Sequence, residues 1–269
     1  MDTSDAAFYA ENSTLQSEHV HQIMAQHLKW EQEDRVLDVG CGTGRTSQYI
    51  AQRGVKSVVG IDLSPDFVRY TEENKRNRNV SFCVADIQRS SDLQPAWRQS
   101  FDKAVSFYVL HLVRDKRIAL ENISACLKPD GRLLMIVPTD DNVLMVTTRF
   151  MSAHQRWGRY LADCPQMMPW SADDQEGLSR LVEDCGFEVL SCEWPLLRHW
   201  YGSEEDTVSA MLPFLGLRHV PEDEQADFLS NWWACARSMT DLSGCSVAID
   251  SAGRVAWSFR IFIIHARRV

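Results

Sequence analysis

The sequence lacks several features that would place a protein in a class at once. None of its 269 residues belongs to a run of about 18 apolar residues, so we expect no membrane-spanning helix. Residues 1–12 are polar and acidic and contain no apolar segment of the kind that directs secretion. The formal net charge is −9, and lysine and arginine form no cluster in the sequence. Both observations argue against nucleic acid as a partner.

Metal sites and disulfide frameworks are not indicated either. The eight cysteines form no C-x-x-C pair, and no cluster of histidine and cysteine has the spacing of metal ligands. We expect reduced, mostly buried thiols and a cytoplasmic protein without a metal. With 45% hydrophobic and 24% charged residues, the chain suits one globular domain that carries insertions, and nothing in it indicates an oligomeric state.

A glycine-rich turn follows the first short apolar run. The run, 36–39, is typical of a buried strand, and Gly40, Gly42 and Gly44 come directly after it. Glycine suits a sharp turn whose backbone a ligand must approach, and the helical pattern that follows would present free N–H groups to that ligand. The dinucleotide fingerprint G-x-G-x-x-G would need glycine at position 45, where the chain has Arg45.

Asp38 sets the chemistry expected at this turn. Its carboxylate, two residues before Gly40, is expected to face the pocket, where it would repel a pyrophosphate but could pair with an ammonium group. The pattern D-x-G-x-G-x-G resembles the first motif of the class I S-adenosylmethionine (SAM)-dependent methyltransferases. The resemblance implies that SAM is the cofactor, that S-adenosylhomocysteine is its product, and that this loop holds the methionine part.

Two further acids close the next two apolar runs. Asp62 follows the run 57–61, and Asp86 follows the run 80–85. In a doubly wound sheet, an acid at the end of the second strand accepts hydrogen bonds from ribose hydroxyls. The resemblance implies that Asp86 contacts the adenine amino group. It also adds three neighbours to the expected cofactor site: Leu63, Ile87, which would pack on the adenine ring, and Phe107.

The order of the elements predicts an α/β fold. Apolar runs alternate with helical patterns, which favours right-handed crossovers and a parallel sheet. We expect a Rossmann-like, seven-stranded, mostly parallel sheet with helical cap insertions, closed by a long antiparallel edge strand. The strands are expected at 36–39, 57–61, 80–85, 101–110, 131–137, 187–192 and 255–267. The helices are expected at 17–28, 45–53, 65–75, 91–98 and 115–127, the last with Ile118 on its buried face.

Two segments exceed the minimal sheet. They cover about 139–170 and 196–244 and are rich in methionine and aromatic residues, which suit a pocket for an apolar molecule. The strings 209–214 and 221–239 resemble the cap of the insect juvenile hormone acid methyltransferases. The expected organisation is therefore a single domain, 1–269, with an N-terminal arm, 1–29, and two cap insertions.

The arm itself resembles two families that methylate carboxylates. Its string Y-A-x-N-S-x-x-Q, from Tyr9 to Gln16, is similar to the start of the plant enzymes that esterify salicylate and jasmonate. Its last part is also similar to the juvenile hormone acid methyltransferases. The resemblance implies that Tyr9 and Ser13 contact the cofactor and that Gln16 binds the substrate carboxylate. A capped helix entry is the alternative interpretation.

The residues after the fourth strand carry the acceptor signal. The string 106–112, S-F-Y-V-L-H-L, resembles S-F-Y-x-L-H-W of the insect enzymes, and it lacks the Asn/Asp-Pro-Pro-Tyr string of amino-methyltransferases. The resemblance places His111 beside the substrate. It also places Leu112 where the related families have a tryptophan whose indole N–H donates to the carboxylate. In the cap, Trp200 and His199 are candidate substitutes for that donor.

These observations predict a SAM-dependent O-methyltransferase. The acceptor implied by the resemblance is the carboxylate of an apolar small acid, such as juvenile hormone acid, farnesoic acid or a fatty-acid-like molecule. A carboxylic acid is ionised at neutral pH, so a site without a general base suits it. Two alternatives stay open: a methyltransferase for an amine or a phenol, and an inactive relative that binds SAM or a lipid.

Overall fold

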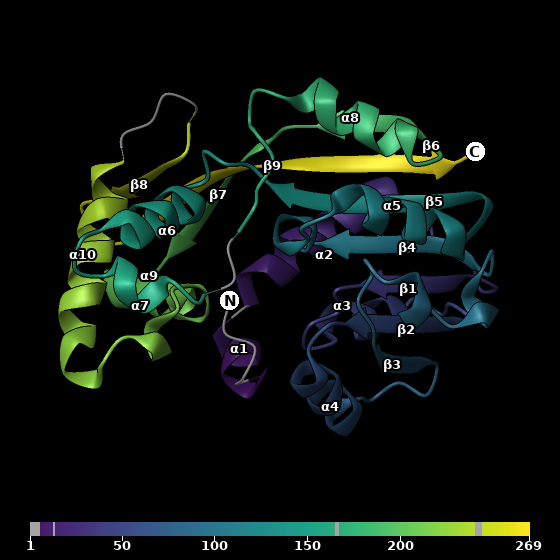
Figure 1. The fold of residues 1–269 in the computed structure, drawn as a ribbon, viewed down its shortest axis with the longest axis horizontal. Helices are drawn as coiled ribbons and strands as arrows, with labels where there is room; N and C mark the ends of the chain where they lie inside the picture. The colour runs from purple at the N-terminus through teal and green to yellow at the C-terminus, as the bar shows by residue number, and fades with distance from the viewer. Residues whose placement is uncertain (1–5, 13, 165–166, 240–243) are drawn as a thin grey trace.

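The computed structural model describes residues 6–12, 14–164, 167–239 and 244–269, and it does not describe the side chains of residues 11–18. The chain forms two lobes with the first two helices between them (Figure 1). One lobe is a sheet covered by helices, and the other is a smaller cap. Within the described residues, no helix is long and apolar enough to cross a membrane.

Seven strands form the continuous path of the sheet, in the order β3-β2-β1-β4-β5-β9-β6. The strands of this path are β1 (Arg35–Val39), β2 (Ser57–Asp62), β3 (Val80–Val84), β4 (Phe101–Phe107), β5 (Leu127–Pro138), β6 (Phe187–Glu193) and β9 (Val255–Arg268). The first five strands pair in parallel, so their carboxyl ends meet at one edge of the sheet. The predicted Rossmann-like sheet is confirmed.

Strand β9 differs from its predicted place at the edge of the sheet. It pairs antiparallel with β5 on one side and with β6 on the other, so β6 is the edge. Residues 261–264, in the middle of β9, are all buried, as in an internal strand with both faces covered. Its first half reaches into the cap, where it pairs with β7 (Leu196–Tyr201) and β8 (Ser246–Ile249). The cap is therefore partly a sheet.

The helices of the sheet lobe lie on both faces of the sheet. They are α2 (Thr14–His27), α3 (Arg45–Ala51), α4 (Pro65–Asn74), α5 (Lys116–Cys126) and α8 (Gln175–Asp184). Residues of α5 and α8 share one buried apolar cluster with the sheet, and residues of α2, α3 and α4 share the other. Ser64 caps α4 by accepting a hydrogen bond from Phe67 N at 3.4 Å.

Three details of the predicted elements are wrong. The helix expected at 91–98 is two 3₁₀ turns, Ser90–Asp92 and Pro95–Trp97, because Pro95 has no N–H to continue a helix. The fourth strand ends at Phe107 rather than at 110, and a 3₁₀ turn follows it. Ile118 is exposed, because the buried face of α5 begins one residue later.

The two insertions fold together into the cap. The cap contains β7, β8, α6 (Val143–Ala153), α7 (Gly158–Leu161), α9 (Glu204–Met211) and α10 (Gln225–Ser238). Its core is aromatic: Trp157, Phe228 and Trp232 are fully buried. The indole Nε1 of Trp232 in α10 donates to Thr147 Oγ1 in α6 at 3.1 Å, which ties the second insertion to the first.

The N-terminal arm bridges the lobes. The ring of Tyr9 in α1 (Ala6–Asn12) lies 5.3 Å from Phe67 of the sheet lobe and 5.8 Å from Phe214 of the cap, both edge-on. Arg45, the first residue of α3, donates from Nη2 to the carbonyl of Ala10 at 2.5 Å. The arm therefore sits against both the glycine turn and the cap.

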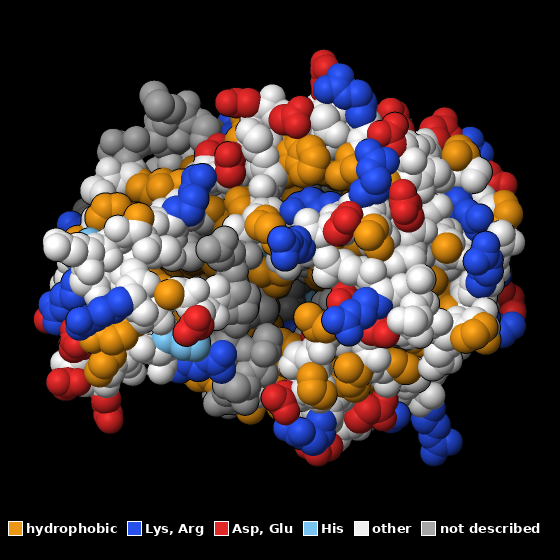
Figure 2. Space-filling view, viewed as in Figure 1, with side chains coloured by type: hydrophobic (Ala, Val, Ile, Leu, Met, Phe, Trp, Pro, Cys, Tyr) orange, Lys and Arg blue, Asp and Glu red, His pale blue; other side chains and the backbone are white. Residues whose placement is uncertain are grey.

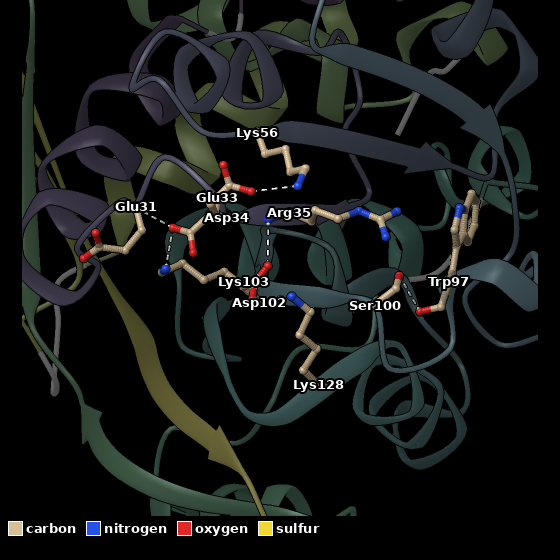
Figure 3. Close-up of polar contacts among 10 residues, drawn as sticks. All are labelled: Glu31, Glu33, Asp34, Arg35, Lys56, Trp97, Ser100, Asp102, Lys103 and Lys128. Carbon is tan, nitrogen blue, oxygen red and sulfur yellow. Dashed lines mark hydrogen bonds and ion pairs between the residues drawn. The ribbon is translucent and has the colours of Figure 1, made fainter.

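Charged residues gather at the amino ends of the parallel strands, where β1 and β4 begin (Figure 3). Lys103 and Asp34 form a buried ion pair with 2.5 Å between Nζ and Oδ2. Asp102 accepts hydrogen bonds from the backbone N–H of Arg35 at 2.9 Å and from Lys128 Nζ at 2.6 Å. These contacts join the strand starts to one another.

Candidate functional site

An open cleft of about 1480 Å³ lies along the carboxyl ends of β1 to β4. We call it the strand-end cleft. The molecule is hollowed between the two lobes on the face shown in Figure 2. The cleft is lined by Gly40 and Gly42 and by six other residues predicted for the cofactor: Tyr9, Asp62, Leu63, Asp86, Ile87 and Phe107. Residues far apart in the sequence meet here because parallel strands end together.

The glycine turn has the geometry that only glycine adopts easily. The φ angles of Gly40, Gly42 and Gly44 are 75°, 52° and 71°. A Cβ on Gly40 would lie 2.2 Å from Val109 Cγ2, and a Cβ on Gly44 would lie 2.7 Å from Phe82 Cζ. A Cβ on Gly42 would meet nothing within 4 Å. Gly42 therefore turns its open side to the cleft.

Asp62 is held by the backbone of the turn. Its Oδ2 accepts the N–H of Gly42 and its Oδ1 accepts the N–H of Ser64, each at 2.9 Å. Burial raises the pKa of this carboxyl, against the effect of these hydrogen bonds. Each carboxylate oxygen has a second lone pair. The carboxylate is therefore fixed in orientation and can still accept donors from a ligand.

Asp38 lies beneath the turn rather than in the cleft. It is 2% exposed and does not line the cleft, contrary to the expected orientation toward the pocket. Its Oδ2 accepts a hydrogen bond from Ser47 Oγ of α3 at 2.5 Å. Burial raises the pKa of Asp38 to about 7, and the nearby Asp62 adds to that rise. The side chain joins β1 to α3 from below.

The end of β3 forms an acidic and apolar corner of the cleft. Asp86 Oδ1 accepts the backbone N–H of Gln88 at 2.9 Å, and Arg89 Nε lies 3.5 Å from Asp86 Oδ2. Ile87 is buried but lines the cleft, and Leu63 is 66% exposed there. Two apolar side chains beside a carboxylate suit a flat ring that carries a hydrogen-bond donor.

The residue after β4, Tyr108, is one that the sequence analysis missed. Its φ of 59° is uncommon for a residue other than glycine and often marks a functional site. Its hydroxyl is buried, with no hydrogen-bond partner within the part of the chain that the structure describes. Burial raises its pKa. Its position directly after Phe107, at the carboxyl end of a central strand, is the sequence signal that could have indicated it.

Between the glycine turn and the arm lies a smaller pocket of about 470 Å³. Tyr9 and Arg45 line it together with Gly42, Phe107 and Tyr108. Four of these five residues also line the strand-end cleft, so the pocket is continuous with it. Burial raises the pKa of Tyr9. The arm therefore forms one wall of the site at the glycine turn.

A second cavity of about 870 Å³ lies between the sheet and the cap. We call it the apolar cavity. Residues from both insertions line it, among them Met145, Met167, Met211 and Phe214, together with Trp257 and Phe259 of β9. Tyr108 and Leu112 line both this cavity and the strand-end cleft. The two spaces therefore meet at the residues that follow β4.

The described lining residues of the apolar cavity include no aspartate, glutamate, lysine or arginine. Their ionisable side chains are two tyrosines and three histidines: Tyr108, Tyr201, His19, His111 and His199. His111 Nδ1 is buried, and no described residue partners it. Burial lowers the pKa of His111 to about 3, so its imidazole is neutral at neutral pH. Nor do the described residues contain a group of three side chains that could hold a metal ion.

Three predicted residues need separate mention. Trp200 does not line the apolar cavity: it is 45% exposed, and Arg254 lies over its ring at 5.1 Å. Alternation along β7 turns its neighbours His199 and Tyr201 into the cavity instead. Ser13 lies outside the described residues. Gln16 belongs to α2, but its side chain is likewise not described.

A family model and two similar proteins of known name are all methyltransferases. A family described as "Methyltransferase domain" matches residues 31–184, more than half of the chain. The juvenile hormone acid O-methyltransferase of Bombyx mori is 25% identical over 99% of this chain and 98% of its own length. The enzyme of the same name from Drosophila melanogaster is 26% identical over 85% of this chain and 81% of its own.

Solved structures share the fold. The YcgJ protein of Bacillus subtilis superposes with a TM-score of 0.64 at 18% identity, over 93% of this chain and 98% of its own. An S-adenosylmethionine-dependent methyltransferase, described as putative, from Listeria monocytogenes gives a TM-score of 0.57 at 16% identity, over 94% and 99%. At these identities the likeness concerns the fold alone.

Proposed function

The chain belongs to the methyltransferase domain family as a class I SAM-dependent enzyme, and from that premise we propose that it esterifies the carboxylate of an apolar small acid. The observation that carries the proposal is the apolar cavity of about 870 Å³. It meets the strand-end cleft at Tyr108 and Leu112, and its described lining residues include no acidic or basic side chain other than histidine and tyrosine. The similarity to two juvenile hormone acid O-methyltransferases, over 99% and 85% of this chain, supports the same acceptor.

The strand-end cleft fits SAM. Asp62 would accept the ribose hydroxyls, since its carboxylate is already oriented by two backbone N–H groups. Asp86 would accept from the adenine amino group, with Leu63 and Ile87 against the ring. The open side of Gly42 would face the methionine part. The other residues proposed for the cofactor are Tyr9, Ser13, Gly40, Gly44 and Phe107. Asp38, which lies beneath the turn, would act on the site only by joining β1 to α3.

The chain's own part in the reaction is mainly positioning. When bound, SAM supplies a methyl carbon on a sulfonium, which a carboxylate oxygen can attack in line to leave S-adenosylhomocysteine. A carboxylate needs no base, because its pKa is about 4 to 5. The apolar cavity would strip water from the carboxylate and hold the apolar chain, and Leu112 would keep the junction dry. Gln16 and neutral His111 are the proposed neighbours of the carboxylate.

The proposed organisation is a single domain. The arm, 1–29, would complete the site, since Tyr9 lines the strand-end cleft and contacts both Phe67 and Phe214. The insertions, about 139–170 and 196–244, would form the acceptor side. Their shared aromatic core and the bond from Trp232 to Thr147 support treating them as one cap.

The test is a transfer assay with methyl-labelled SAM and three acceptors that share one apolar chain: an acid, an amine and a phenol. We expect label in the acid alone, and mild alkali should release it as methanol, as from an ester. Alkali-stable label in the amine or the phenol would contradict the carboxyl assignment and support the other class of enzyme. A protein that binds SAM but labels none of the three would be an inactive relative.

A further inference from the structure

Asn142 lies in the wall of the apolar cavity and has no part in the site described above. It follows the end of β5, the strand that pairs with β4, and β4 leads to Leu112. It is 7% exposed, and it lines the apolar cavity together with Leu112 and His111. A buried amide in a mostly apolar wall calls for an explanation, because an unpaired polar group costs free energy there.

The contacts of Asn142 fix the orientation of its amide. As the cap of α6, its Oδ1 accepts the backbone N–H of Leu144 at 3.0 Å. An N–H donor must face the oxygen of the amide, so the NH₂ group is the part that points away from the helix. Across the described chain, no hydrogen bond from Asn142 Nδ2 is found. The N–H donors of Asn142 Nδ2 are therefore available to a ligand in the cavity.

We propose that Asn142 Nδ2 donates a hydrogen bond to the carboxylate of the methyl acceptor and so determines the specificity for acids. The inference rests on the proposed function. The related enzymes are expected to use an indole N–H at the position of Leu112, which here carries no donor. An amide suits the role because it stabilises the anion without the ion pair that would reduce the nucleophilicity of its oxygen.

The first test is Asn142→Asp, which has almost the same shape. Aspartate caps a helix as well as asparagine does, so α6 should keep its stability. At about pH 8 the carboxylate removes the donors and adds a charge that repels the acceptor. We expect the KM for the acid to rise about tenfold or more, with SAM affinity and the melting temperature unchanged. An unchanged KM in the folded variant overturns the proposal.

The second test separates donation from capping. Asn142→Ser retains a capping oxygen but replaces the NH₂ group by a hydroxyl that is one bond shorter, so it should also raise the KM by about tenfold without a change in melting temperature. Adding Leu112→Trp to this variant should restore much of the loss, because it supplies an indole donor from the neighbouring strand end. If Asn142 only caps α6, the serine variant keeps the wild-type KM, and the proposal is wrong.

Failure of this inference differs from failure of the proposed function. If the unaltered protein methylates no acid, the proposed function fails before any variant is made. If it methylates an acid and both variants do so with the wild-type KM, only the role of Asn142 fails. Calorimetric titration of the acid in the presence of S-adenosylhomocysteine gives a second readout, in which both variants should bind the acid about tenfold more weakly.

Discussion

The amino and carboxyl ends of the parallel strands differ in how completely their polar side chains are paired. At the amino ends of β1 and β4, charged side chains are paired: Lys103 with Asp34, and Lys128 with Asp102 (Figure 3). At the carboxyl ends, some polar groups lack a hydrogen-bond partner among the described residues, as the buried hydroxyl of Tyr108 does. The first end satisfies its own charges and serves stability, while the second leaves bonding capacity for ligands.

Backbone strain is less one-sided. Tyr108 and the three glycines of the turn have positive φ angles at the carboxyl ends of β1 and β4, but Gln99 and Asp130 also have positive φ angles near the amino ends of β4 and β5. Strain of this kind persists where the surrounding packing enforces it, and it is common at binding sites. We therefore expect changes at the amino ends to affect folding, and changes of the side chains that line the cleft at the carboxyl ends to affect binding and turnover.

The largest expected effect is on stability, from Lys103→Ala. Removal of the lysine leaves the carboxylate of Asp34 buried without its partner, which should cost about 3–5 kcal/mol of unfolding free energy. Urea denaturation measures it. Lys128→Ala, in the more exposed pair with Asp102, is the matched control and should cost about 1 kcal/mol or less. SAM affinity of either folded variant should be unchanged. A loss of affinity would contradict the view that the amino ends serve stability alone.

A pH-dependent effect of a few kcal/mol is expected from Asp38. Its folded pKa of about 7 exceeds the ordinary value of 3.8, so the folded state retains a proton that the unfolded chain releases. The contribution of Asp38 to the free energy of unfolding is therefore greatest below about pH 4, and it falls as the pH rises to about 7. The total fall is about 1.4 kcal/mol for each unit by which the pKa is shifted.

Asp38→Asn should flatten that pH profile. The amide oxygen can still accept from Ser47, but it cannot ionise. Urea midpoints at about pH 4.5 and about pH 8 should differ less in the variant than in the unaltered protein. Some slope should remain, because burial also raises the pKa of Asp62. Equal slopes in the two proteins would show that Asp38 does not hold a proton in the folded state.

Asp62→Ala should weaken SAM binding by roughly 1.5–3 kcal/mol, or about 10- to 150-fold, because it removes charge-assisted hydrogen bonds to the ribose. Calorimetry with SAM and with S-adenosylhomocysteine measures it, and both ligands should lose equally. The variant also loses the contacts to Gly42 and Ser64, so circular dichroism must first show that it is folded. Unchanged affinity in a folded variant would remove Asp62 from the cofactor site.

The sheet and the places of Asp62 and Asp86 were predictable from the sequence because both depend on local patterns. A strand followed by glycine or aspartate is visible in one dimension, and parallel pairing brings those ends together without further information. Asp62 and Asp86 accordingly line one cleft. Strand β9 was misplaced because one strand's pattern does not reveal how many neighbours it has; that depends on where β6 docks.

The acceptor side was harder to predict for a physical reason. Whether Trp200 or its neighbour His199 faces the cavity depends on the register of β7 against β9, and a shift of one residue would exchange them. Asn142 was missed because asparagine before a helix is usually explained by capping alone. Only the three-dimensional structure shows that its capping oxygen leaves the NH₂ group beside a cavity.

The smallest expected effect is a gain, from Leu112→Trp. Leu112 lines both the strand-end cleft and the apolar cavity, so an indole there would add one N–H donor near the acceptor carboxylate. One hydrogen bond to a charged group is worth roughly 1.5–3 kcal/mol.

Since Asn142 already supplies a donor in our proposal, the gain in kcat/KM for apolar acids should be about tenfold or less in the unaltered background. The gain should be larger in Asn142→Ser, where only the shorter hydroxyl competes, and SAM affinity should be the same in both. A gain for the phenol or the amine instead of the acid would mean that the carboxyl end of β4 recognises another acceptor. The open polar groups there would then serve a chemistry other than esterification.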